Sequence, residues 1–327
     1  MRVLVTGGAG YIGSIVAERL LATGDEVVVY DNLATGHHAA VPPGARFVQA
    51  DLADSEALRA ELRGVDAVIH MAAVSLVGVS VRDPSSYWHQ NVTLGLGLLD
   101  AMRATGVSRM VFSSSAAVYG EPERQPVDED DATRPTSPYG DTKLAFERAL
   151  QNYGRAYGLR SVSLRYFNAA GASERAGEAH EPETHLVPRV LRVALGVDPG
   201  PLQVFGDDYP TRDGTCVRDY VHVLDLADAH VRALRALAGG HAGGVYNLGC
   251  GGAGWSVKEV LDAARGVTGR DIPVEVGPRR PGDPAVLVAR SDRARSELGW
   301  TPRHESLEDM VGSAWAWMQR YPHGWAG

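Results

Sequence analysis

The sequence contains 327 residues, of which 44% are hydrophobic and 22% are charged. This composition is typical of a globular enzyme and excludes a disordered, collagen-like or low-complexity chain. The length allows one large α/β domain or a main domain with a smaller partner. The net charge is -8 and no run of lysine or arginine forms a basic patch, so we expect no nucleic-acid partner.

Cysteines and apolar runs indicate the compartment. The two cysteines, Cys216 and Cys250, have no metal-type spacing and are weak evidence for a disulfide, so we expect a reducing cytoplasm and no metal site. A strand-like run begins at Arg2, so we expect no signal peptide. No apolar run reaches the roughly 18 residues that a membrane helix needs, so we expect no membrane association.

The first half of the chain alternates short β-branched runs with longer segments of helical periodicity. This alternation predicts a doubly wound parallel sheet, a Rossmann arrangement of six or seven strands with helices on both faces. The predicted strands are 3–5, 27–29, 46–48, 65–69, 110–112 and 161–164. The predicted helices are 12–22, 55–62, 84–104 and 138–157, the last with Ser137 as its N-cap and Pro138 in its first turn.

The composition changes after Tyr166. Residues 168–184 are rich in glycine, glutamate, proline and histidine, which predicts a surface segment. The expected elements beyond it are helices at 186–195, 257–267 and 306–317, strands at 202–205 and 245–248, and a helix that Asp225 caps. We therefore divide the chain into a doubly wound domain, 1–168, and a smaller mixed α/β domain, 169–327. Segments near 217–237 and 245–249 are expected to pack back on the first domain.

Glycines directly follow the first predicted strand. The segment GGAGYIG places Gly7, Gly10 and Gly13 where the chain turns from strand to helix. Such glycines let the backbone approach a pyrophosphate, which the N–H groups at the helix start then bind. A Cβ at Gly10 should block this site. The alternative is a tight turn without a ligand, but the register of strand, glycines and helix favours a dinucleotide.

An acidic residue ends the second predicted strand. Asp31 lies about 20 residues past the glycines, where a carboxylate accepts both ribose hydroxyls and repels a 2′-phosphate. Its position predicts NAD rather than NADP, with a solvated strand-end carboxylate as the alternative. After the third strand, Asp51 and Leu52 are expected to flank the adenine. For Asp51, an N-cap of helix 55–62 is an equal alternative.

Helix 138–157 carries a tyrosine and a lysine on one face, because Tyr139 and Lys143 have i, i+4 spacing. Lowering a phenol pKa from about 10 to near 7 requires roughly 4 kcal/mol, which the ammonium and a positive nicotinamide ring can supply. Tyr139 is therefore predicted to be a general base. Ser115, after strand 110–112, is predicted to hydrogen-bond a substrate hydroxyl or relay its proton. Ser113 and Ser114 are predicted to cap the backbone.

Together these segments resemble the UDP-glucose 4-epimerases (UDP-galactose 4-epimerases) of the extended short-chain dehydrogenase/reductase family. The resemblance covers nearly the whole length. The matching segments are TGGAGYIG at 6–13, DN at 31–32, SSS at 113–115, VYG at 118–120, SPYGDTK at 137–143, LRYFN at 164–168, FGDDYPT at 205–211, VRDYVH at 217–222 and RRPGD at 279–283. The last four are far more specific to this family than the glycines are.

The resemblance implies interconversion of UDP-galactose and UDP-glucose in galactose metabolism, through a transient 4-keto sugar and an NAD that stays bound. It also implies a homodimer formed through helices 84–104 and 138–157. The implied cofactor-binding residues are Gly7, Gly10, Tyr11, Ile12, Gly13, Asp31, Asn32, Asp51, Leu52, Tyr139, Lys143 and Phe167. The implied substrate-binding residues are Ser115, Tyr139, Asn168, His185, Leu186, Phe205, Arg218, Arg280 and Asp283. Of these, the two arginines suit the phosphates and the aspartate suits a ribose.

Several positions depart from the family pattern. Ala73 and Ser75 stand where some members have Gly and a cofactor-contacting Lys, and Ala117 replaces a common Thr. His185 stands where some members have a uridine-contacting Asn. Leu287 stands where some members have a bulky Tyr and where those accepting N-acetylated sugars have a small residue. We therefore hypothesise that the chain turns over some UDP-N-acetylglucosamine (UDP-GlcNAc) and UDP-N-acetylgalactosamine (UDP-GalNAc).

Three other functions deserve comparison. A sugar-nucleotide 4,6-dehydratase needs an acid and a base directly after the strand-end hydroxyl, and Ala116 and Ala117 occupy these positions. An epimerase of another UDP- or TDP-sugar stays open, because hexose selectivity depends on pocket shape. A non-catalytic NAD-sensing regulator on the same fold also stays open, although it has no need of Ser115, Tyr139 and Lys143 together.

Overall fold

A seven-stranded parallel sheet forms the centre of the computed structural model, which describes residues 1–280 and 283–325. The strand order is β11-β6-β5-β4-β1-β2-β3, so the order reverses between β1 and β4, where α/β sheets bind ligands. The strands are β1 (Arg2–Thr6), β2 (Glu26–Asp31), β3 (Arg46–Gln49), β4 (Ala67–His70), β5 (Arg109–Ser115), β6 (Arg160–Tyr166) and β11 (Gly243–Leu248).

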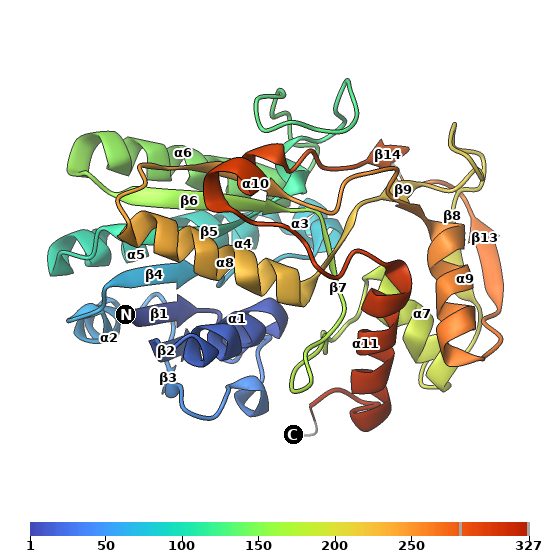
Figure 1. Ribbon diagram of the computed structural model, residues 1–327, viewed down its shortest axis with the longest axis horizontal. Helices are drawn as coiled ribbons and strands as arrows, with labels where there is room; N and C mark the ends of the chain where they lie inside the picture. The colour runs from blue at the N-terminus through green and yellow to red at the C-terminus, as the bar shows by residue number, and fades with distance from the viewer. Residues whose placement is uncertain (281–282, 326–327) are drawn as a thin grey trace.

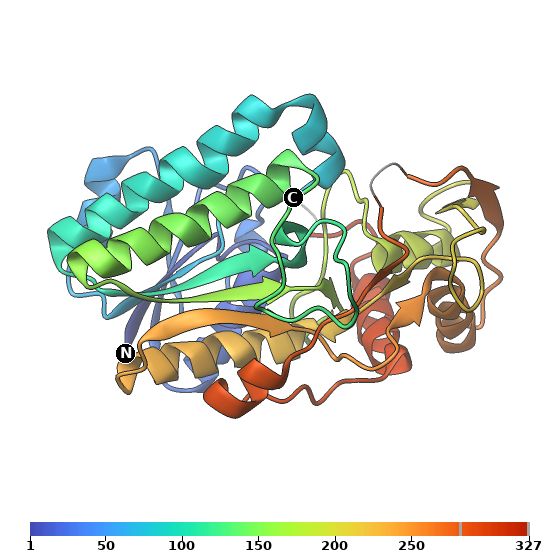
Figure 2. The same cartoon turned by 90° about the horizontal axis from the view of Figure 1, so that it is seen from above.

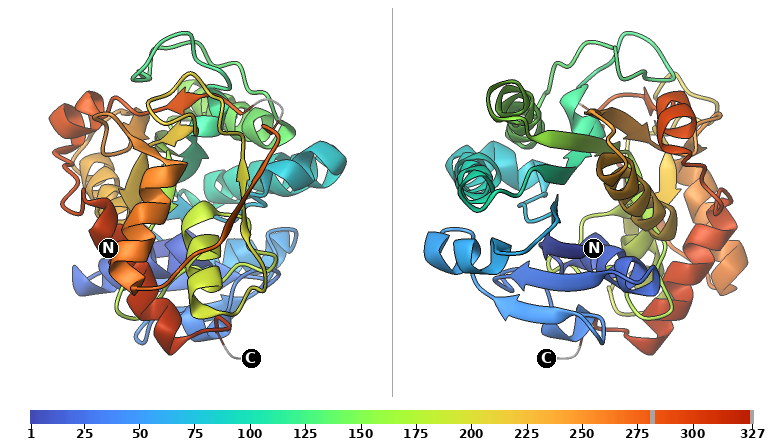
Figure 3. Two further views of the ribbon diagram at one scale, coloured as in Figure 1. Left: turned by 90° about the vertical axis from the view of Figure 1, so that its right-hand side faces the viewer. Right: turned by 60° about the vertical axis from the view of Figure 1, so that its left-hand side comes forward.

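Helices cover both faces of this sheet (Figure 2 and Figure 3). Successive residues of β1 point to opposite faces, so Val3 and Val5 pack in a core with α1 and α8, whereas Leu4 packs in another with α2, α5 and α6. The predicted doubly wound sheet is therefore confirmed. The flanking helices are α1 (Tyr11–Ala22), α2 (Ser55–Leu62), α5 (Leu94–Thr105), α6 (Pro138–Tyr157) and α8 (Val223–Ala238).

The predicted helix 84–104 is not continuous. It divides into α4 (Pro84–Trp88), a π-helical turn η2 (His89–Thr93) and α5. The buried side chain of Asn91 donates to the Val74 carbonyl at 3.0 Å and to the Thr142 hydroxyl at 3.1 Å. These bonds tie the turn to α6 and to the segment after β4. Such π-helical turns are frequent near functional sites.

A second, smaller core lies to the right of the sheet in Figure 1, where the apolar faces of α7, α9 and α11 meet. Three short sheets extend it, in the orders β10-β7, β12-β9-β14 and β13-β8. Its elements are β7 (Asn168–Ala170), α7 (Leu186–Leu195), β8 (Leu202–Phe205), β9 (Val217–Arg218), β10 (Tyr220–His222), β12 (Trp255–Ser256), α9 (Val257–Thr268), β13 (Val274–Gly277), β14 (Val286–Leu287) and α11 (Leu307–Arg320). The helix α10 (Asp292–Leu298) instead packs beside β11 and α8 in the first core. Short helical pieces elsewhere are η1 (His38–Ala40), α3 (Val77–Arg82) and η3 (Ala116–Val118).

Two predictions of local structure are wrong. Segment 168–184 is not simply surface, because it begins with β7 and because Ala172 and Ala176 are buried in the two cores. Asp225 does not cap α8: the imidazole of His222 accepts the N–H of Leu224 there. The Asp225 carboxylate instead accepts two backbone N–H groups of the segment that precedes α11. Within the described residues, no helix combines the length and the apolar character needed to cross a membrane.

Candidate active site

The turn between β1 and α1 is closed by contacts that only glycine permits. Gly7 has φ +71°, and its N–H donates to the Tyr30 carbonyl at 3.0 Å. A Cβ added at Gly13 would lie 2.1 Å from the Gly7 carbonyl oxygen. At Gly10, by contrast, the nearest atom to an added Cβ is the same oxygen at 3.3 Å. The fold therefore requires glycine at Gly7 and Gly13. At Gly10 a Cβ would make a tight contact that a small shift relieves, and its absence leaves the backbone beside the helix start uncovered by a side chain.

The N-terminus of α1 is suited to an anion. Its N-cap is Gly10, which has no side chain to cap the helix, and the first turn has no acidic residue. The positive end of the helix dipole and the N–H groups of Tyr11 and Ile12 are thus available to a pyrophosphate. The hydroxyl of Tyr11 is bound elsewhere, to the Gly171 carbonyl at 2.5 Å, so only its backbone is free for a phosphate.

Asp31 lies beside this turn. One carboxylate oxygen accepts the Ala9 N–H at 3.0 Å, and the other accepts the Leu33 N–H at 2.8 Å. The side chain is held at the carboxyl end of β2, where a dinucleotide ribose lies in folds of this type. Open backbone at Gly10, a helix N-terminus without a cap and this carboxylate together fit NAD.

Asn32, Asp51 and Leu52 lie at the same edge of the sheet, because β2 and β3 are paired. The Asn32 amide donates to the Asp51 carboxylate at 2.6 Å. Asp51 is not the N-cap of α2, since the side chain that accepts there is Asp54, from the N–H of Ala57. The cap alternative for Asp51 is therefore wrong.

Tyr139, Lys143 and Ser115 meet where β5 ends and α6 begins. The Ser137 hydroxyl accepts the Gly140 N–H at 3.3 Å with Pro138 in the first turn, so the predicted helix start is confirmed. The Lys143 Nζ lies 5.7 Å from the Tyr139 ring centroid, so the two side chains share a face. The Ser115 hydroxyl lies close enough to the Tyr139 phenol to lower its pKa.

The pKa values of this pair differ from the expectation. Burial raises the pKa of Tyr139 to about 12, although hydrogen bonding by Ser115 lowers it. Burial also lowers the pKa of Lys143 to about 7, against the attraction of Glu147. Without the cofactor, burial thus keeps the pKa of Tyr139 high. The predicted lowering toward 7 requires the Lys143 ammonium and the nicotinamide ring together, and it stays a prediction. A low dielectric raises the free-energy cost of forming the phenolate.

A buried polar network supports the pair, and the sequence analysis missed it. The Glu147 carboxylate forms an ion pair with Arg165 at 2.6 Å and accepts the Ser114 hydroxyl at 2.5 Å. The Ser113 hydroxyl bonds to the Tyr166 hydroxyl at 2.7 Å. Ser113 and Ser114 thus do not cap the backbone, and the serine that does is Ser115, which accepts from Ala117 at 3.2 Å. The sequence signal that could have indicated this network is the spacing of Lys143 and Glu147, which lie one helical turn apart on the same face of α6.

Several residues expected to bind UDP lie at the surface of the smaller unit, on β7, β8 and β9 and on the segment after β13. Arg218 forms an ion pair with Asp283 at 2.5 Å. The Arg280 guanidinium stacks on the Phe205 ring at 3.9 Å, and within the described residues it has no carboxylate partner within 4.0 Å. Asn168 lies next to this region, because its backbone N–H donates to the backbone carbonyl of Asp219, the residue after Arg218. Two residues of the RRPGD segment, 281 and 282, lie outside the described residues.

Three residues expected to bind the substrate or the cofactor, His185, Leu186 and Phe167, each contact other residues of the protein. The Nδ1 of His185, just before α7, faces Glu178 and Glu183, and Leu186 packs against the second core. Phe167 is buried among Ala116, Leu144 and Leu287. It therefore lies close to the end of β5 and to α6, where Tyr139 stands.

The comparisons with known proteins agree with this geometry. The sequence profile of the NAD dependent epimerase/dehydratase family matches residues 3–249. A UDP-glucose 4-epimerase of Corynebacterium glutamicum is 53% identical over 317 residues, 97% of this chain and 95% of the relative. A crystal structure of a UDP-glucose 4-epimerase is similar with a TM-score of 0.97 and 48% identity over 100% of both chains. The structure of UDP-glucose 4-epimerase from Brucella ovis in complex with NAD has a TM-score of 0.93 and 46% identity, over 96% of this chain and 97% of that one. The chain therefore belongs to the NAD dependent epimerase/dehydratase family, in its UDP-glucose 4-epimerase group.

Proposed function

We propose that this chain is an NAD-dependent UDP-glucose 4-epimerase, which interconverts UDP-galactose and UDP-glucose in galactose metabolism. The observation that carries the proposal is the position of Tyr139, beside Lys143 and Ser115, at the edge of the sheet where the glycine turn also lies. The residues after Ser115 are Ala116 and Ala117, so the carboxylates that a dehydratase would need are absent from these positions.

The side chains have distinct roles in this reaction. Tyr139 removes the proton from the sugar 4-hydroxyl, and Ser115 hydrogen-bonds that hydroxyl and the phenol. Lys143 holds positive charge beside the phenolate. Bound NAD would supply reversible hydride transfer at C4 through a 4-keto sugar, and it would remain bound through the cycle. The residues proposed to hold it are Gly7, Gly10, Tyr11, Ile12, Gly13, Asp31, Asn32, Asp51, Leu52 and Phe167.

We propose that the smaller core binds the UDP group. Arg280 is exposed and has no carboxylate partner in the described part of the chain, so its guanidinium is available to the diphosphate. Arg218 and Asp283 form one ion pair, which places a phosphate ligand and a ribose ligand side by side. The other proposed substrate contacts are Asn168, His185, Leu186 and Phe205.

The domain division and the assembly are also proposals. Residues 1–168 form the cofactor-binding domain and residues 169–327 form the sugar-nucleotide domain, of which the segments near 217–237 and 245–249 pack back on the first domain. The chain is a homodimer in the cytoplasm, formed through α4, α5 and α6. Trp88 on α4 and Tyr157 at the end of α6 support this interface, because they are 43% and 58% exposed.

The function is tested with protein purified without added cofactor. We expect NAD to remain bound through gel filtration, and UDP-galactose to be converted when no NAD is added. Tyr139→Phe should lose turnover and keep NAD. Tyr153→Phe is the matched control on the same helix, because its hydroxyl binds Asp100 at 3.0 Å, away from the site. Bound NAD without turnover of any UDP- or TDP-hexose would favour a regulator, and full activity of Tyr139→Phe would falsify the base assignment.

A further inference from the structure

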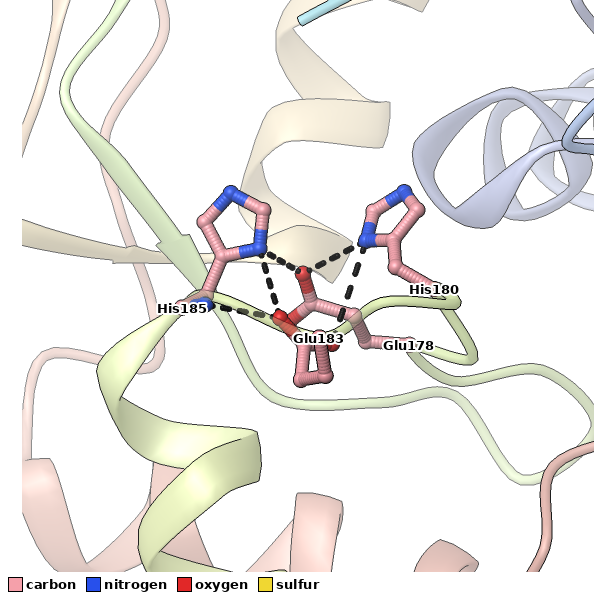
Figure 4. Close-up of side chains that lie close together, drawn as sticks. All are labelled: Glu178, His180, Glu183 and His185. Carbon is pink, nitrogen blue, oxygen red and sulfur yellow. Dashed lines mark hydrogen bonds and ion pairs between the residues drawn. The ribbon is translucent and has the colours of Figure 1, made fainter. Parts of the chain in front are cut away.

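Four side chains of the loop before α7 converge on one point (Figure 4). Glu178, His180, Glu183 and His185 each offer one ligand atom, and these atoms all lie within 4.8 Å of one another. In Figure 4 the two imidazoles turn their Nδ1 atoms toward the carboxylates between them. The proposed epimerase chemistry uses His185 alone of the four, so the convergence calls for another explanation.

The distances suit a tetrahedral metal ion. The Nδ1 of His185 lies 2.7 Å from the Glu178 Oε1 and 3.0 Å from the Glu183 Oε1. The Nδ1 of His180 lies 3.0 Å from the same Glu178 oxygen and 3.9 Å from the Glu183 Oε2. Zinc bonds of about 2.0–2.2 Å at tetrahedral angles place neighbouring ligand atoms roughly 3.3 Å apart. The four distances, two of them to different oxygens of Glu183, bracket this value. One ligand atom from each residue can be chosen so that all four lie within 4.8 Å of one another, and side-chain shifts complete the shell.

The charges of the cluster also favour a cation. The side chains of Glu178 and Glu183 are 9% and 4% exposed, and their ion-pair partners among the described residues are the two histidines, not an arginine or lysine. Buried carboxylates need a positive partner. Protonating both histidines would place two like charges on rings whose centroids are 5.4 Å apart. One dication neutralises both carboxylates and leaves both imidazoles neutral.

We propose that these four side chains bind one zinc ion, through Nδ1 of each histidine and one oxygen of each glutamate. Four protein ligands close the shell, as in structural zinc sites, and imidazole and carboxylate are among the ligands that zinc takes. The Glu183 Oε1 is already oriented, because it accepts the N–H groups of Thr184 and His185, each at 2.7 Å. Such outer contacts hold a ligating carboxylate in place.

The site joins segments that carry the two proposed binding sites. The Tyr11 ring, at the start of α1, stands edge-on to His180 at 6.4 Å. The Nε2 of His37 lies 3.2 Å from the Ala179 carbonyl. Leu186 follows the last ligand directly and begins α7. Zinc therefore fixes this loop between the cofactor-binding turn and the nucleotide-binding region, and the Nε2 of His185 remains free to donate to the substrate.

The test uses the untagged full-length protein, because a histidine tag binds zinc itself. Protein loaded with zinc chloride and then desalted should carry zinc in stoichiometric amount by inductively coupled plasma mass spectrometry. Dialysis against EDTA should remove the zinc and lower the melting temperature, and zinc should restore it. Cobalt added to the stripped protein should give the visible absorption of four-coordinate Co²⁺.

Two variants and a control locate the metal. His180→Gln and Glu178→Gln should lose stoichiometric zinc and the cobalt absorption while circular dichroism shows a folded protein. His304→Gln should keep both, because His304 pairs with a single carboxylate, Asp309, at 2.7 Å. If loaded wild-type protein carries no more zinc than His180→Gln, the cluster is an ion-paired one and the proposal is wrong. The metal readouts do not depend on turnover, so they separate this proposal from the epimerase assignment.

Discussion

The ammonium of Lys143 donates a hydrogen bond of 2.8 Å to the backbone carbonyl of Ser113. This bond joins the second turn of α6 to the end of β5. It holds the ammonium beside the Tyr139 ring. Lys143 is 4% exposed, and burial lowers its pKa to about 7. The burial that places the Lys143 ammonium beside the phenol thus also disfavours the positive charge of that ammonium.

We expect Lys143→Met to lose epimerase activity and to raise the melting temperature. The usual lysine pKa is 10.5 and the folded value is about 7, so the unfolded chain holds the proton more tightly between these pH values. The folded state therefore bears the full cost of the charge below pH 7, and the cost disappears as the pH rises toward 10.5. The stability gain of the variant should be largest in acid and shrink in alkali.

Differential scanning fluorimetry across this pH range measures the gain. Lys258→Met is the matched control, because Lys258 is exposed and its ammonium also donates to a backbone carbonyl, that of Asp213. A melting temperature of Lys143→Met that is lower than wild type at every pH would show that the hydrogen bond outweighs the charge burial.

Gly10→Ala and Gly13→Ala should fail for different reasons. An added Cβ meets nothing closer than 3.3 Å at Gly10 but lies 2.1 Å from a backbone oxygen at Gly13. We expect Gly10→Ala to fold and lose NAD, and Gly13→Ala to lose its fold. Circular dichroism and the ratio of absorbance at the nucleotide and protein bands measure both. Gly97→Ala, which meets nothing within 4 Å in α5, should keep fold and NAD; retained NAD in Gly10→Ala would contradict close approach of the pyrophosphate there.

Glu147→Gln should destabilise the fold and shift the pH profile. Removing one partner of a buried ion pair leaves Arg165 uncompensated, at a cost of about 3–5 kcal/mol. Glu147 also raises the Lys143 pKa, so its loss should move the alkaline limb of the rate profile to lower pH. Glu123→Gln is the control, because its pair with Arg134 is 81% and 73% exposed. Urea unfolding and initial rates measure the two effects, and an unmoved limb would assign Glu147 a purely structural role.

Leu287→Tyr should narrow the range of sugar nucleotides that the protein turns over. Leu287 packs beside Ala116, Tyr119 and Phe167, next to the Ser115 end of β5, where the hexose is proposed to bind. We expect wild-type protein to turn over UDP-GlcNAc as well as UDP-galactose, and the variant to lose at least about tenfold on the acetylated sugar alone, the scale of one misfit group in a pocket. Val286→Ile, on the opposite face of β14, should change neither rate. Absence of UDP-GlcNAc turnover by wild type would end this hypothesis.

Contacts within one element were predictable from the sequence. The strand and helix periods, the glycines after β1 and the i, i+4 spacing of Tyr139 and Lys143 depend on backbone geometry that residues close in the chain determine themselves. The prediction of a continuous helix at 84–104 was wrong, and the π-helical turn that interrupts it carries Asn91, whose bonds reach segments elsewhere in the sequence.

The ion-pair partners and the pKa values of the site residues could be found only from the tertiary structure. Arg218 and Asp283 each matched a motif, but their ion pair joins residues 65 positions apart. The pKa values of Tyr139 and Lys143 depend on what packs around them. The Glu and His residues at 178–185 were visible in the sequence as composition, and only the folded structure shows that their ligand atoms converge. Electrostatic energies depend on distance and burial in space, and the order of residues along a chain specifies neither.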